Sequence, residues 1–184
     1  ELLVRLFRGE LRRREWTQLA RRKPMQVKPE NLTSFRKQLP FALTESQNQV
    51  IGELIADLKG TLPMNRLLQG DVGSGKTVVA AAAMYLTFLN GYRSFLMAPT
   101  EILAEQHYKT ITTLFNPFGI KVGLQTGSKK YQTAKTKLKK NFQAENVNLL
   151  PDILVGTHAL IEKKVRLGNV GLVVIDEQHR FGVT

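Results

Sequence analysis

Cysteine is absent from the 184-residue sequence, and so is any long apolar run. Without thiols the chain has no disulfide framework, no thiolate metal site and no cysteine nucleophile, which is compatible with a reducing compartment. The longest mostly apolar stretch, Val78 to Leu89, is much shorter than the roughly 20 residues that a transmembrane helix needs. The sequence therefore predicts a soluble protein without a membrane partner.

Acidic residues are also few compared with basic ones. The chain has 27 Lys and Arg against 15 Asp and Glu, which gives a formal net charge of +12. A balance this basic favours a polyanionic partner, and nucleic acid fits better than a membrane surface. The alternative is a basic face that contacts only solvent. With 42% apolar residues the chain can bury the core of one principal domain.

The first 38 residues differ in pattern from the rest. They predict a basic helix followed by a linker that Pro24 and Pro29 interrupt, with a compact domain over residues 39–184. The basic helix either docks on a neighbouring domain or contacts nucleic acid phosphates. Because the chain starts at Glu1 and stops soon after a strand pattern, we expect it to be a piece of a longer protein.

Beyond this segment, helix and strand patterns alternate. We expect a helix over residues 44–58, a short strand over 66–68, a helix ending at Asn90 and a strand leading into a helix capped by Thr100. Three further apolar runs follow, in KVGLQTG, DILVGTH and VGLVVIDE. This alternation predicts an α/β fold with a parallel sheet and helices on both faces. The lysine-rich residues 128–140 predict a surface helix with a solvated basic face.

The segment QGDVGSGKT has the spacing of a phosphate-binding loop, G-x-x-x-x-G-K-[ST]. The helix after it would direct its positive N-terminus at phosphates, and glycines would leave the backbone N–H groups accessible. Lys76 would neutralise the β- and γ-phosphates and Thr77 would bind Mg²⁺. We therefore expect ATP or GTP, with Mg²⁺, at residues Gly70, Asp71, Val72, Gly73, Ser74, Gly75, Lys76 and Thr77.

A second half of the site is predicted where an apolar strand, Leu172 to Ile175, ends in two acids. Asp176 and Glu177 follow at its carboxyl end, where open α/β sheets place ligands. We expect Asp176 to hold Mg²⁺, partly through water, and Glu177 to orient or deprotonate the attacking water. Together with Lys76 they are the catalytic candidates.

A phosphate loop combined with D-E-x-H resembles the first RecA-like motor domain of a superfamily 2 helicase. FALTESQ is similar to the Q motif of that family, APTEILAEQH to motif Ia, VGTHALI to a motif that tracks DNA, and VVIDEQHRFGV to motif II. Together, over residues 36–184, they resemble the RecG family of bacterial ATP-dependent helicases, which act on branched DNA. Transcription-repair coupling translocases share H-R-F-G-V but usually have phenylalanine at the position of Ser74.

The resemblance implies roles for further residues. Gln47 would contact the adenine edge, although Thr44-x-x-Gln47 also fits a capping box, and the two roles are compatible. His179, which the resemblance adds to the catalytic candidates, would couple the nucleotide state to the DNA-side motifs, the alternative being an ordinary packed or surface histidine. The candidate contacts to the DNA backbone, whose alternative role is loop formation and helix capping, are Pro99, Thr100, Glu101, Gly156, Thr157 and His158.

The resemblance also implies partners and a location. The family's motor has a second RecA-like domain with arginine fingers and a wedge domain that splits the branch, and neither matches part of this sequence. We therefore expect ATP-driven remodelling of branched duplex DNA in the bacterial cytoplasm, at the nucleoid, in recombination and repair. Alone, the chain should hydrolyse ATP barely, because an arginine finger contributes about 10³ to 10⁵ in rate. The alternatives are a general duplex translocase and a non-motor P-loop ATPase switch.

Overall fold

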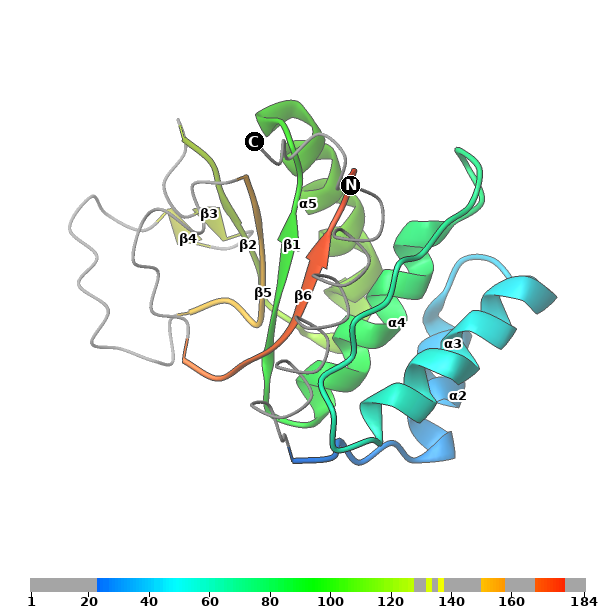
Figure 1. Ribbon diagram of the computed structural model, residues 1–184. Helices are drawn as coiled ribbons and strands as arrows, with labels where there is room; N and C mark the ends of the chain where they lie inside the picture. The colour runs from blue at the N-terminus through cyan, green and yellow to red at the C-terminus, as the bar shows by residue number, and fades with distance from the viewer. Residues whose placement is uncertain (1–22, 128–131, 134–135, 138–149, 158–167, 178–184) are drawn as a thin grey trace, which may run out of the picture.

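The computed structural model describes residues 23–127, 132–133, 136–137, 150–157 and 168–177. Its centre is a sheet of six strands in the order β4-β3-β2-β5-β1-β6 (Figure 1). Four neighbouring strands run parallel, and β3 and β4 extend the sheet in antiparallel orientation. The predicted α/β class with a parallel sheet is confirmed. The parallel strands are β2 (Val122–Gln125), β5 (Ile153–Gly156), β1 (Arg93–Met97) and β6 (Val170–Ile175).

The described helices form layers on one face of this sheet. They are α2 (Pro29–Gln38), α3 (Glu45–Leu58), α4 (Lys76–Leu89), α5 (Glu101–Phe115) and the 3₁₀ turn η1 (Asn116–Phe118). Helices α4 and α5 pack on the sheet, and α2 and α3 lie against α4 (Figure 1). The helices predicted on the other face of the sheet lie outside the described residues. Within the described ranges no helix has the length and apolarity to cross a bilayer.

The direction of α4 positions the site. Nine of its residues between Val78 and Thr87 are buried, because the helix lies between the sheet and α2 and α3. It ends at Asn90, and Gly91 with φ +76° makes the turn into β1. Since α4 and β1 are joined by this short turn and pack together, they are antiparallel. The N-terminus of α4 at Lys76 therefore lies at the carboxyl edge of the parallel strands.

The segment predicted as a linker contains α2. Pro29 is in the first turn of this helix, where no N–H donor is needed, and Pro40 lies just beyond its end at Gln38. The prolines therefore mark where the helix begins and ends. They do not produce an irregular connection.

Residues 25–38 also pack into the core of the domain. Phe35 is fully buried, with its ring centroid 5.4 Å from that of Tyr85 and 6.0 Å from that of Phe118. The backbone N–H of Met25 donates to the carbonyl oxygen of Leu58 at 3.0 Å. The boundary predicted at residue 39 thus runs through a packed region.

Two other predicted elements differ from the structure. Residues 66–68 form no strand, and Leu67 is 70% exposed, because no strand among the described residues pairs with this segment. The surface helix predicted over residues 128–140 is wrong, since β3 (Gln132–Thr133) and β4 (Thr136–Lys137) pair there. The β-branched threonines suit a strand, and the helical spacing rested on three residues outside the described ranges.

Replacing Phe35 by alanine should lower the free energy of unfolding by about 3 to 5 kcal/mol, because it removes a fully buried ring from the contact between α2, α4 and η1. Urea denaturation followed by circular dichroism measures the change. Leu89→Ala, at a side chain that is 42% exposed, is the control and should cost much less. Equal costs for the two variants would mean that α2 is not part of the core.

Candidate functional site

Three strands end together at one edge of the sheet. Met97 of β1 pairs with Gly156 of β5 on one side and with Ile175 of β6 on the other. Beyond these ends, the N–H of Ala98 donates to Gly156 at 2.9 Å and the N–H of Asp176 donates to Met97 at 2.9 Å. The predicted residues after each strand are thus brought together, as parallel pairing requires.

The phosphate loop precedes α4 at this same edge. Gly75 is the N-cap of α4 in the left-handed conformation, with φ +79°, and it supplies no side-chain cap to the N–H groups of the first turn. The ammonium of Lys76 donates to the carbonyl oxygens of Gly70 and Asp71, both at 2.8 Å. The lysine therefore closes the loop, and Val72 at its tip is fully exposed.

Gln47 connects the start of α3 with the phosphate loop. Its Oε1 accepts from the N–H of Thr44 at 3.0 Å, while its own N–H donates to Thr44 Oγ1 at 3.2 Å, so the predicted capping box is confirmed. Its Nε2 donates to the carbonyl oxygen of Ser74 at 3.0 Å. A Cβ atom at Gly75 would overlap this Nε2. The adenine role of Gln47 stays a prediction.

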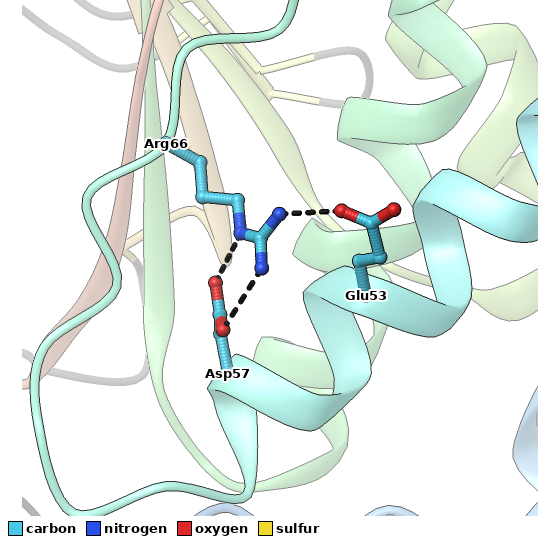
Figure 2. Close-up of polar contacts among 3 residues, drawn as sticks. All are labelled: Glu53, Asp57 and Arg66. Atoms are coloured by element: carbon cyan, nitrogen blue, oxygen red, sulfur yellow. Dashed lines mark hydrogen bonds and ion pairs between the residues drawn. The ribbon is translucent and has the colours of Figure 1, made fainter.

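Arg66 holds the segment before the loop against α3 (Figure 2). Its Nη1 is 2.5 Å from Glu53 Oε2, its Nη2 donates to Asp57 Oδ1 at 3.2 Å, and its Nε also pairs with Asp57. The hydrogen bonds that Arg66 donates, first to Asp57 and then to Glu53, raise the pKa of Arg66 above its ordinary value. The sequence analysis missed this cluster, whose signal was two acids four residues apart on one helix face.

Asp176 lies at the end of β6 and contacts α5. Its Oδ2 is 2.6 Å from Nε2 of His107, and the side chains are 33% and 17% exposed. Glu177 follows with φ +52°, a left-handed conformation that is uncommon for a residue other than glycine. Such backbone strain is frequent at functional sites, where it orients a side chain.

The candidate DNA contacts that the structure describes lie beside this pair. Thr100 caps α5, accepting from the N–H of Leu103 at 3.3 Å, so its capping role is confirmed. Gly156 is buried in the sheet, whereas Thr100 is exposed. Contacts of these residues with DNA stay predictions. The remaining candidates are Pro99, Glu101 and Thr157, which are half-buried, and His158, which lies outside the described residues. His179, the predicted coupling residue, also lies outside them.

The end of β2 belongs to the same edge, although the sequence analysis did not single it out. Gln125 pairs with Gly156, and its buried Oε1 has no hydrogen-bond partner among the described residues. A Cβ at Gly127 would lie 3.0 Å from Oε1 of Glu101, so this turn approaches the start of α5. The sequence signal that could have identified Gln125 was its position at the end of a predicted strand.

A shallow hollow of about 400 Å³ lies in front of α3. Phe41, 49% exposed, is its aromatic member, and Nη2 of Arg36 donates to Asn48 Oδ1 at 2.8 Å on its wall. The lining is completed by Ala42 and Leu43. Asn48, which contributes to the lining, directly follows Gln47 in the sequence. Sequence reasoning missed Phe41.

The protein oxygens at this edge fit Mg²⁺. In the described part of the chain, no group of three or more His, Cys, Asp or Glu side chains could hold a metal ion by itself. Mg²⁺ that accompanies a nucleotide needs only one or two protein oxygens, because phosphates and water supply the rest. The hydroxyl of Thr77 at the start of α4 and the carboxylate of Asp176 are such oxygens.

A model of the DEAD/DEAH box helicase family matches residues 44–184. The chain belongs to this family. ATP-dependent DNA helicase RecG of Bacillus subtilis (strain 168) is 51% identical over 154 residues, which are 84% of this chain and 22% of that protein. RecG of Staphylococcus aureus (strain NCTC 8325 / PS 47) is 53% identical over the same shares of the two chains.

A solved structure of RecG bound to a three-way DNA junction has a TM-score of 0.76 and 39% sequence identity. The likeness covers 94% of this chain and 23% of that one. The resemblance inferred from the helicase motifs is confirmed, as is the RecA-like fold. The chain spans less than a quarter of the length of the RecG proteins that it matches.

Gly75→Ala should destabilise the protein more than Gly73→Ala. Both residues have positive φ, +79° and +85°, so alanine adds about 1 kcal/mol of strain at either position. Only Gly75 has Gln47 beside it, and displacing that amide costs about 1 kcal/mol more through the lost hydrogen bond to Ser74. Urea unfolding measures the free energy of unfolding of both variants.

The same comparison in a Gln47→Ala background is the control. There the additional cost of Gly75→Ala over Gly73→Ala should disappear. If the difference persists without Gln47, the amide is not what restricts position 75.

Proposed function

We propose that this chain supplies the ATP-binding half of a DNA helicase motor that remodels branched DNA. The observation that carries the proposal is the meeting of a phosphate loop at the start of α4 with Asp176 and Glu177 at the end of β6, in a chain about half identical to RecG. The ordering of strand ends brings the candidate DNA residues to the same edge. Nucleotide and DNA sites would thus share one rigid sheet.

The residues at this edge would have separate roles in ATP hydrolysis. Lys76 would exchange the carbonyl oxygens of Gly70 and Asp71 for phosphate oxygens, as the N–H groups at the start of α4 also bind phosphate. Bound Mg²⁺, held by Thr77 and Asp176, would neutralise charge on the phosphates. Glu177 would orient the attacking water and accept its proton.

The hollow in front of α3 fits the adenine base. Phe41 would stack on the ring while Gln47, already fixed between α3 and the loop, would meet its polar edge. Since the same glutamine contacts Ser74, base binding would be transmitted to the phosphate loop through one side chain. The capping and adenine roles of Gln47 are therefore compatible.

Phe41→Ala should weaken ATP binding about tenfold, because stacking of a base on an aromatic ring contributes about 1 to 3 kcal/mol. Calorimetric titration of the complete gene product with ATP measures the loss. Inorganic triphosphate is the control ligand, and its affinity should not change, because it has no base to stack. Equal weakening of both ligands would exclude a base contact at Phe41.

The parts of the motor outside this chain are also proposals. The RecG proteins are more than four times longer than the matched region, so a second RecA-like domain with arginine fingers and a wedge domain would come from elsewhere in the parent. ATP would close the cleft between the two RecA-like domains, and hydrolysis would reopen it. The contacts of Thr100 and Thr157 with DNA would be made to the backbone, since a motor must release each base pair that it passes.

ATP turnover of the complete gene product tests the function. We expect weak turnover without DNA, moderate turnover with linear duplex and the strongest stimulation with a model replication fork at equal phosphate concentration. Lys76→Ala should abolish turnover under all three conditions because the phosphate charge loses its cation. A phosphate-release assay reports the rates.

The other outcomes favour other functions. Equal stimulation by linear duplex and fork would indicate a general duplex translocase of the transcription-repair coupling type. Absence of any stimulation by DNA would indicate a P-loop ATPase switch whose acidic partner is not DNA.

A further inference from the structure

The contact between His107 and Asp176 joins two segments that are 69 residues apart in the sequence. A carboxylate that binds a cation is ionised and only accepts hydrogen bonds, so in the cation-bound state of the proposed function Nε2 of His107 would donate to Oδ2. The two atoms are 2.6 Å apart, which is within hydrogen-bond distance. This bond would limit the rotation of the carboxylate and would leave Oδ1 as the oxygen available to a cation.

The histidine is itself held in place by its helix. His107 lies one turn from Ala104 and one turn from Ile111, which are both fully buried, so all three occupy the face of α5 that packs on the sheet. Only 17% of the His107 side chain is exposed. Its imidazole therefore has little freedom to turn away from Asp176.

The main chain reinforces the same arrangement. The N–H of Asp176 donates to the carbonyl oxygen of Met97, which is the last residue of β1. The chain then passes through Ala98 and Pro99 into α5. The partners of Asp176 in these two contacts thus belong to one unit, β1 with α5, which holds the residue through its backbone and its side chain.

We infer that His107 is a positioning residue that orients the carboxylate of Asp176 toward the Mg²⁺ ion of the bound nucleotide. Partners of this kind fix the direction of a metal-binding carboxylate, and their loss lowers metal affinity about 10-fold to 100-fold. The inference rests on the proposed function, which assigns Asp176 to the cation. The alternative is that the pair only fastens α5 to β6.

The experiment compares three variants of the complete gene product, His107→Leu, His107→Gln and Gln106→Ala. Binding of N-methylanthraniloyl-ADP is followed by fluorescence during a Mg²⁺ titration and again in EDTA, and the thermal midpoint of each variant is recorded. Gln106 is an exposed neighbour on α5 and provides the matched control.

His107→Leu should raise the Mg²⁺ concentration at half-saturation about tenfold while nucleotide affinity in EDTA stays within about twofold. His107→Gln should recover most of the loss, because its amide N–H can also donate to Asp176. Gln106→Ala should behave as the unmodified protein. The metal-specific loss and its recovery by glutamine are effects that a purely structural contact would not produce.

The inference is overturned if His107→Leu leaves the Mg²⁺ dependence unchanged, if it weakens binding equally with and without Mg²⁺, or if glutamine gives no recovery. Asp176→Asn, measured in parallel, separates this failure from failure of the proposed function. If Asp176→Asn leaves the Mg²⁺ dependence unchanged, the assignment of Asp176 to the cation is wrong, and the role of His107 falls with it. If Asp176→Asn raises the Mg²⁺ concentration at half-saturation and His107→Leu does not, the cation assignment stands and the positioning role is wrong.

Discussion

The burial of α4 is the constraint on which the rest of the structure depends. This helix is apolar on all sides, and the small residues Ala81 and Ala82, both fully buried, let it lie close to its neighbours. Because it is enclosed by the sheet and by α2 and α3, its axis cannot shift without opening the core. Its N-terminus is therefore fixed at the sheet edge, and a phosphate loop attached to it has a defined position.

Helix α3 is the second support of the loop. Gln47 of α3 contacts the loop itself at Ser74. Glu53 and Asp57 of the same helix hold Arg66 in the segment before the loop (Figure 2). The ion pairs at Arg66 are partly exposed and contribute little to overall stability. Their effect is geometric, since they hold a segment that no strand pairs with against a helix of the core.

One helix also connects the two kinds of site at the sheet edge. Thr100, a candidate DNA contact, is the N-cap of α5, and His107, which contacts Asp176, lies in the second turn of this helix. Because the buried face of α5 is packed on the sheet, a rigid-body displacement of α5 would move Thr100 and His107 together. The proposed DNA contact and a residue next to the proposed cation site therefore belong to the same helix.

The sequence alone determined the helicase motifs and most of the alternation of helices and strands. The phosphate loop, the acids after the last strand and the capping box at Thr44 could be predicted, because each depends on residues close together in the chain or on a spacing that the backbone dictates. The alternation of helix and strand patterns was enough to predict an α/β fold.

Only the tertiary structure decided the features that depend on distant partners. The segment predicted as a linker contains a core helix, because Phe35 is buried against Tyr85. Leu67 is not part of a strand, because no described strand pairs with its segment. The contact of His107 with Asp176 has no local signal at all, since an isolated histidine on a helix has no preference for one distant carboxylate. Long-range pairing is set by the packing of whole elements, and a linear pattern does not contain it.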